Sequence, residues 1–202
     1  SRDSAEQLRC VAPPLALVND SAPAALSTLT ITLNGQQFTT SAADFAYFGL
    51  PAAAALSPSC GPSEGGTLVT VTGSSLSNGS AYRCGFGEDD SGGPQQVVVA
   101  SLDAGTATLR CVAPSGLQTG ALRFEVSLNA QDFTSSGLRF ERYSQVYVSA
   151  LLPRSGPSSG GTPILVVHPN SFGCAPRCRV GNTTNVVVAG TYVSNTSTAC
   201  VS

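Results

Sequence analysis

The sequence of 202 residues lacks lysine, methionine and tryptophan, and it has a single histidine. Charged residues make up 11% of the chain, against roughly a quarter in an average soluble domain. The ten basic residues are scattered arginines and the net charge is −2, so nucleic acid is not expected as a partner. No apolar run approaches the roughly 20 residues of a membrane-spanning helix, so we expect no direct membrane insertion of this segment.

What the sequence does contain is internal repetition. Three segments recur in order: residues 8–13 as 109–114, residues 33–39 as 128–134, and residues 61–67 as 156–162. The copies lie about 95 to 101 residues apart, which is the length of a small β-sandwich. We therefore expect three parts: the back of one module plus a linker (1–55), a complete module (56–148) and the front of a further module (149–202).

Period-two alternation predicts β-strands throughout. In residues 67–72 branched apolar residues alternate with hydroxyl residues, which places Val69 and Val71 on the face toward the core. Ile164 and Val166 occupy the matching positions in the next copy.

Further strands are predicted at residues 97–99, 186–188 and 122–128, the last with Phe124, Val126 and Leu128 on one face. The alanine-rich residues 52–55 are too few for a stable helix and lie between two prolines. We interpret them as part of a linker, residues 49–55, matched by a second linker at residues 144–150.

The repeated residues resemble the IPT/TIG family, the immunoglobulin-like domains of plexins, transcription factors and related receptors. The resemblance is carried by a proline, a Gly-Pro turn, a Gly-Gly-Thr sequence and two cysteines: Pro58, residues 61–62, residues 65–67, Cys84 and Cys111, then Pro153, residues 156–157, residues 160–162, Cys178 and Cys200. It covers essentially the whole chain and implies an all-β fold of tandem immunoglobulin-like β-sandwiches, one complete and two partial. The absence of tryptophan argues against an antibody-type domain, whose core surrounds one.

In extracellular members of this family the two motif cysteines pair. The resemblance therefore implies the disulfides Cys84–Cys111 and Cys178–Cys200. Cys10 matches Cys111, so we expect its partner to lie before Ser1. Cys60 and Cys174 pair with each other or with neighbouring modules, or one is a free thiol; the residues leave these alternatives open.

Four glycosylation sequons accompany the cysteines. They begin at Asn19, Asn78, Asn182 and Asn195. One sequon alone arises easily by chance, but four together with repeat-phased cysteines indicate the secretory pathway. We therefore expect an extracellular or cell-surface location and N-linked glycans.

Three patterns that suggest chemistry have simpler interpretations. Residues 61–65 and 156–160 match the G-x-S-x-G nucleophile elbow, but a strand follows each rather than a helix, and His168 is the single histidine. Residues 174–178 hold two cysteines without the further ligands of a zinc site, which favours a disulfide-bearing loop. The carboxylates of residues 88–90 suit calcium but fit a solvated hairpin tip better. We expect no enzyme, no metal and no cofactor.

Several aromatic residues occupy matched positions, which indicates packing rather than ligand stacking: Phe38 and Phe133, Phe45 and Phe140, Phe48 and Tyr143. Tyr82 and Tyr147 have no aromatic counterpart and are candidate contact residues.

Together these features predict a structural or adhesive segment of a large glycosylated extracellular protein, a semi-rigid spacer or filament-building array. Its partners would be other modules of the same protein and other subunits of an extracellular assembly. An extracellular ciliary filament or a cell-wall protein would fit the composition, which lacks lysine. The alternative is the ectodomain stalk of a plexin-like receptor. The DNA-binding use of this fold, as in Rel-like transcription factors, is disfavoured by the sequons, the paired cysteines and the net charge of −2.

Overall fold

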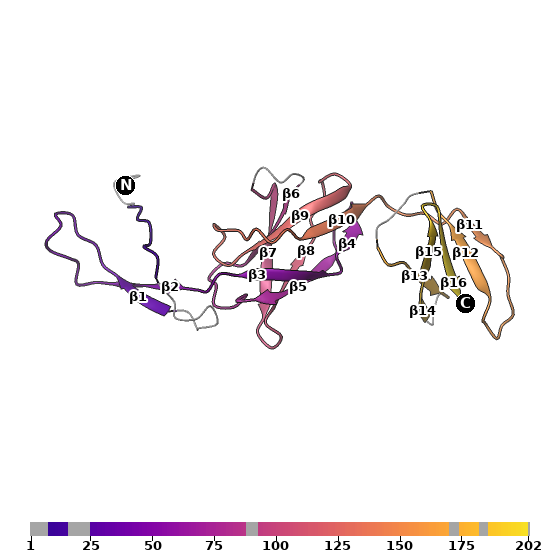
Figure 1. Ribbon diagram of the computed structural model, residues 1–202, viewed down its shortest axis with the longest axis horizontal. Helices are drawn as coiled ribbons and strands as arrows, with labels where there is room; N and C mark the ends of the chain where they lie inside the picture. The colour runs from indigo at the N-terminus through magenta and orange to yellow at the C-terminus, as the bar shows by residue number, and fades with distance from the viewer. Residues whose placement is uncertain (1–7, 16–24, 88–92, 170–173, 182–185, 202) are drawn as a thin grey trace. The chain divides into compact units, whose positions relative to one another are not determined.

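A computed structural model of the chain describes residues 8–15, 25–87, 93–169, 174–181 and 186–201. Every element in these ranges is a β-strand, which confirms the all-β prediction (Figure 1). The described ranges contain no helix that could cross a membrane. The chain divides into two units, Ser1–Leu50 and Pro51–Ser202.

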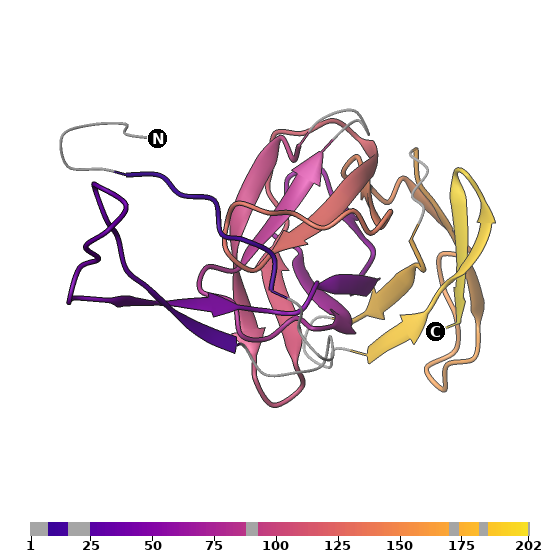
Figure 2. The same cartoon turned by 60° about the vertical axis from the view of Figure 1, so that its left-hand side comes forward.

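The first part of the second unit is a sandwich of eight strands. They are β3 (Ala52–Ser57), β4 (Cys60–Pro62), β5 (Leu68–Ser74), β6 (Arg83–Gly87), β7 (Gln96–Asp103), β8 (Thr108–Val112), β9 (Gly120–Ser127) and β10 (Arg139–Tyr143). They pair in the order β3-β5-β8-β7-β6-β9-β10-β4, and Figure 2 shows them after a 60° turn. Because β7 pairs with β6 through residues 96–99 and with β8 through residues 100–103, it passes from one layer to the other.

The core lies between these two layers and is built by the alternating residues. Val69 and Val71 are fully buried, as the alternation predicts. The Phe86 ring of β6 meets Phe124 and Phe140 edge-on, with ring centroids 5.1 and 5.7 Å apart. Such edge-to-face pairs add to the free energy that burial of the rings contributes.

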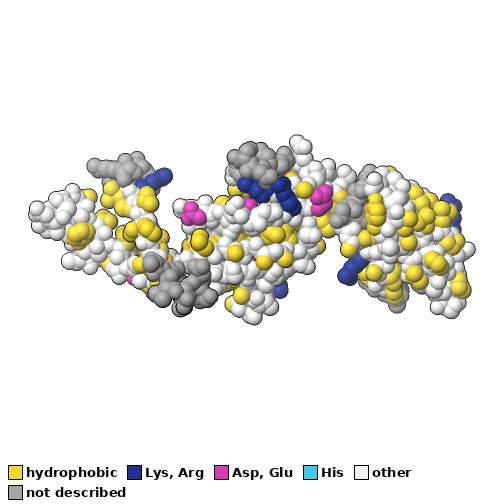
Figure 3. Space-filling view, in the orientation of Figure 1, with side chains coloured by type: hydrophobic (Ala, Val, Ile, Leu, Met, Phe, Trp, Pro, Cys, Tyr) yellow, Lys and Arg dark blue, Asp and Glu magenta, His cyan; other side chains and the backbone are white. Residues whose placement is uncertain are grey.

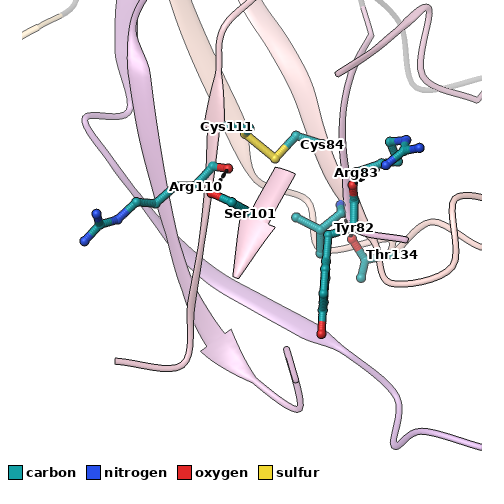
Figure 4. The surroundings of a disulfide bond; sticks show 8 residues. Tyr82, Arg83, Cys84, Ser101, Arg110, Cys111 and Thr134 are labelled. Carbon is teal, nitrogen blue, oxygen red and sulfur yellow. Dashed lines mark hydrogen bonds between the residues drawn. A yellow bond between two sulfur atoms is a disulfide. The ribbon is translucent and has the colours of Figure 1, made fainter. Parts of the chain in front are cut away.

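A disulfide between Cys84 of β6 and Cys111 of β8 joins the two layers inside this core. The cysteine side chains point toward each other, whereas Arg110 points away from them (Figure 4). Arg110 instead forms a 2.9 Å ion pair with Asp103 on the surface. An exposed pair of this kind contributes little to stability, so the disulfide and the apolar residues hold the layers together.

The interpretation of residues 52–55 as a linker is wrong, because they form most of β3. Ala53 is buried and pairs with Gly73 of β5, and Leu56 pairs with Val71. Alanine has little intrinsic preference for strands, but the partner strand satisfies its backbone groups, and pairing overrides propensity. After the cis peptide bond that precedes Pro58 the chain enters the other layer, where β4 pairs in parallel with β10.

Residues 150–201 repeat the front of this sandwich. Their strands are β11 (Ala150–Leu152), β12 (Pro163–Val167), β13 (Arg177–Val180), β14 (Val186–Ala189), β15 (Thr191–Ser194) and β16 (Ser197–Val201). The order β11-β12-β16-β15 corresponds to β3-β5-β8-β7, and the β13–β14 pair corresponds to β6–β7. A disulfide between Cys178 of β13 and Cys200 of β16 takes the place of the first sandwich's disulfide.

The first unit contains a hairpin that repeats β9 and β10. Its strands are β1 (Ala25–Leu29) and β2 (Ala43–Tyr47). The side-chain oxygen of Asn34 accepts bonds from the N–H groups two and three residues later, at 3.0 and 3.1 Å. Asn129 accepts the same two bonds at 3.0 and 2.9 Å. The two copies therefore share this pair of hydrogen bonds as well as their sequence.

Replacing Cys84 and Cys111 together by alanine should lower the free energy of unfolding by about 3.5 kcal/mol, because the disulfide restricts a long loop of the unfolded chain. Chemical unfolding followed by circular dichroism measures the change. Cys10→Ala is the matched control: Cys10 is the sequence counterpart of Cys111 but is exposed and forms no disulfide with a described residue. A double variant as stable as this control would contradict the prediction.

Candidate functional site

The candidate site lies within the second unit, where the eight-stranded sandwich is joined to residues 150–201. Cys60, the first residue of β4, forms a disulfide with Cys174, which precedes β13. Of the alternatives that the sequence leaves open for these two cysteines, this structure contains the pairing with each other. The signal in the sequence was that Cys60 has a serine, Ser155, as its counterpart in the next copy.

A turn with two glycines holds β4 beside the end of β10. Gly65 and Gly66 have φ angles of +78° and +83°, which glycine adopts without strain. A Cβ atom on Gly65 would lie 2.8 Å from the carbonyl oxygen of Ala113. Ser63 donates its backbone N–H to the Tyr143 carbonyl at 2.8 Å, so the turn is tied to β10.

The disulfide lies at the edge of a hollow of about 520 Å³. Glu64 and Tyr143 line it from the sandwich, and Arg177 lines it from the segment that follows Cys174. Partial burial raises the pKa of the Tyr143 phenol above its ordinary value, and the Glu64 carboxylate raises it further. The phenol is therefore neutral at physiological pH.

The G-x-S-x-G segments are turns that lead into strands. Ser63 precedes β5, and Ser158 lies in the turn before β12, where Gly160 donates its N–H to the Pro157 carbonyl at 3.0 Å. Neither serine is followed by the helix of a nucleophile elbow. His168 is buried, with Nε2 3.1 Å from Thr198 Oγ1.

The described residues contain no cluster of three or more potential metal ligands. Cys174 and Cys178 belong to two different disulfides, which agrees with the prediction of a disulfide-bearing loop. The acidic residues 88–90 lie outside the described residues.

Two of the four sequon asparagines lie in the described residues, and both are exposed. Asn78 is in a turn, with a φ of +67°, and Asn195 lies between β15 and β16. Asn19 and Asn182 fall outside the described residues.

The candidate contact residue Tyr82 forms a hydrogen bond within the chain. Its hydroxyl accepts the Gly79 N–H at 2.9 Å, which closes the turn that carries Asn78. Tyr147 remains exposed between β10 and β11.

The sequence did not single out Glu125, a carboxylate buried in β9. It accepts hydrogen bonds from the hydroxyl of Thr134 at 2.6 Å and from the N–H of Ser136 at 3.1 Å. Burying a charge without such partners is costly, so the acceptor role of Glu125 fixes the loop after β9 to the strand. The signal in the sequence was the pair of hydroxyl residues, Thr134 and Ser136, that lie nine and eleven positions after Glu125.

Two β layers joined by a buried disulfide define an immunoglobulin-like β-sandwich. Residues 51–141 match the family model of the IPT/TIG domain, which confirms the resemblance for this segment. Domains of this type are non-catalytic.

Two solved structures are similar to this chain. One is the full extracellular region of plexin A4, domains 1 to 10, with 21% identity over 82% of this chain and a TM-score of 0.52. The chain spans only 13% of that plexin chain. The other is a plexin A4 extracellular region with domains 1 to 8, with 18% identity over 75% of this chain and 15% of that chain, and a TM-score of 0.45. At 21% identity the likeness to the first of them concerns the fold alone.

Limited trypsin digestion tests the Cys60–Cys174 disulfide. Arg154 is exposed in the loop between β11 and β12, and cleavage there should leave two pieces joined through Cys60 and Cys174. A denaturing gel without reductant should show one band, and reduction should release both pieces. In the Cys60→Ser, Cys174→Ser variant the pieces should separate without reductant.

The matched control is the Cys178→Ser, Cys200→Ser variant, because that disulfide lies wholly on one side of Arg154. Its pieces should stay joined until they are reduced. Separation of the unreduced wild-type pieces would contradict the pairing.

Proposed function

We propose that this chain is a structural or adhesive segment of a large glycosylated extracellular protein, in which tandem IPT/TIG modules form a semi-rigid spacer or filament-building array. One complete module, which begins with β3 (Ala52–Ser57) rather than at residue 56, stands between the back of one module and the front of another. The similarity of residues 51–141 to the IPT/TIG family supports an extracellular or cell-surface setting, as do the three disulfides.

The Cys60–Cys174 disulfide is the observation that carries the proposal. Residues 144–149 contain no strand, and a linker of this length alone would allow the modules to hinge. The disulfide adds a second covalent connection between the same two modules. Two connections at different points oppose rotation about either one, so the pair moves as one stiff segment.

The stalk of a plexin-like receptor is the second candidate, favoured by the similarity in fold to the plexin A4 extracellular region. Both candidates have other modules and other protein subunits as partners, and neither needs a cofactor. A parent protein with a membrane-spanning segment and a cytoplasmic domain would favour the receptor. A long array of such modules without them would favour the spacer.

Nuclear magnetic resonance relaxation tests the stiffness directly. With the disulfide intact, backbone amides of residues 51–143 and 150–201 should report one rotational correlation time. In the Cys60→Ser, Cys174→Ser variant they should report two, because only the linker then joins the modules. Cys10→Ser, which removes an exposed thiol, should leave the wild-type result unchanged. Independent tumbling of the intact protein would overturn the semi-rigid role.

The secretory setting predicts N-linked glycans on the exposed sequons. After expression in secreting eukaryotic cells, intact mass should fall on treatment with a glycosidase specific for N-linked glycans. Ser80→Ala should remove the Asn78 glycan without changing a residue of positive φ, and Asn195→Gln should remove the second. Ser77→Ala, beside the sequon but outside it, is the control. Unmodified asparagines at both positions would contradict the setting.

A further inference from the structure

The turn between β5 and β6 of the complete sandwich restricts which residues can occupy positions 78 and 79. Asn78 has a φ of +67°, a backbone conformation in which asparagine is enriched among residues other than glycine. At position 79 there is no room for a side chain, because a Cβ atom on Gly79 would lie 2.5 Å from the carbonyl oxygen of Leu128. The fold therefore favours the sequence Asn-Gly in this turn.

This sequence brings two groups that can react with each other into neighbouring positions. The backbone nitrogen that follows an asparagine can attack the carbonyl carbon of its side chain, and glycine has no side chain to hinder the approach. Asn78 is exposed, and its side chain forms no hydrogen bond with a described residue. The side-chain amide of Asn78 is therefore free to turn toward the nitrogen of Gly79.

The nitrogen of Gly79 is restrained by Tyr82. It donates its N–H to the Tyr82 hydroxyl at 2.9 Å. To attack a carbonyl carbon the nitrogen has to give up this proton, and a neutral phenol does not take it up. One neutral hydrogen bond is a modest restraint, so Tyr82 slows the attack without preventing it.

We propose that Asn78 is a site of spontaneous deamidation wherever it carries no glycan. The Gly79 nitrogen bonds to Cγ of Asn78 while the Cγ–Nδ2 bond breaks, and the proton of the Gly79 nitrogen leaves with Nδ2 as ammonia. The succinimide ring that results takes up one water molecule at either of its two carbonyl carbons, which gives aspartate or isoaspartate.

The nitrogen that leaves is also the glycosylation acceptor, because Asn78 begins the sequon that Ser80 completes. A nitrogen that carries a glycan cannot leave as ammonia, so the glycan protects the turn. Without it, isoaspartate inserts one extra atom into the main chain of the turn. Either product also adds a carboxylate to a module with few charged side chains, as the face drawn in Figure 3 shows.

A second Asn-Gly sequence, Asn34-Gly35, lies in a different setting. The side-chain oxygen of Asn34 accepts the N–H groups two and three residues later, and its amide donates to the Gln37 side chain. The Gly35 nitrogen donates to the Thr32 hydroxyl at 3.0 Å. Both reacting groups are held in place, so Asn34 should react more slowly than Asn78.

This reaction goes beyond the spacer role and does not depend on the Cys60–Cys174 disulfide. Ser80→Ala removes the sequon but keeps the Asn-Gly sequence, so deamidation can be followed whether or not the wild-type chain is glycosylated. Failure of the proposed deamidation is therefore distinguishable from failure of the secretory setting.

Peptide mapping of the Ser80→Ala variant tests the proposal. The protein is incubated in neutral buffer made with heavy-oxygen water, then reduced, alkylated and cleaved with trypsin and a glutamyl endopeptidase. Cleavage after Arg9, Glu64 and Arg83 places Asn78 in residues 65–83 and Asn34 in residues 10–64. Residues 65–83 should gain heavy oxygen with time, and an isoaspartyl methyltransferase should methylate this fragment. Asn34 should gain heavy oxygen several-fold more slowly.

Tyr82→Phe in the Ser80→Ala background tests the restraint. Loss of the hydroxyl should raise the deamidation rate at Asn78 about fivefold, which corresponds to about 1 kcal/mol of activation free energy. Tyr147→Phe is the matched control, because it removes an exposed phenol hydroxyl elsewhere in the chain, and it should leave the rate unchanged.

Wild-type protein with a glycan on Asn78 should form no isoaspartate at this position. A Ser80→Ala protein in which Asn78 stays unmodified, a rate at Asn34 equal to that at Asn78, or equal isoaspartate formation in the glycosylated wild type would each overturn the proposal. An unchanged rate in the Tyr82→Phe variant would overturn the role of Tyr82.

Discussion

The sandwich depends on strand β6, in which Cys84 and Phe86, two positions apart, must both point into the core. Cys84 bonds to β8 in the opposite layer, and Phe86 packs its ring against β9 and β10. Because successive inward residues of a strand are two apart, one short strand links three others. In the following copy Val180 replaces Phe86, and there the disulfide remains while the aromatic contact does not.

Much of this fold could be predicted because its signals are local. Alternation placed Val69 and Val71 in the core, and the Gly-Gly-Thr sequence marked a turn with positive φ. The strand at residues 52–57 was missed because its alanines acquire strand structure from β5, which pairs with them across the sheet. The intrinsic strand propensity of a residue carries no information about the strand that will pair with it.

The candidate site was less predictable because its parts come from distant segments. Cys60 was conspicuous as an unmatched cysteine, but a partner 114 residues away follows only from the folded chain. Tyr82 was conspicuous for the same reason, and in the structure its hydroxyl closes a local turn. An unmatched residue in a repeat therefore shows where a module differs from its copies, and the structure is needed to show why.

The disulfide between Cys60 and Cys174 has a mechanical consequence. Tension along the chain enters at Cys60 and leaves at Cys174 through the sulfur–sulfur bond, so the residues between them carry none of it. These residues include β5 to β10, which form most of the complete sandwich. The two cysteines are 114 positions apart in the sequence. While the bond is intact the chain between them, about 390 Å long when stretched, cannot be pulled out. The module can therefore transmit a pull without extension of the chain between the two cysteines.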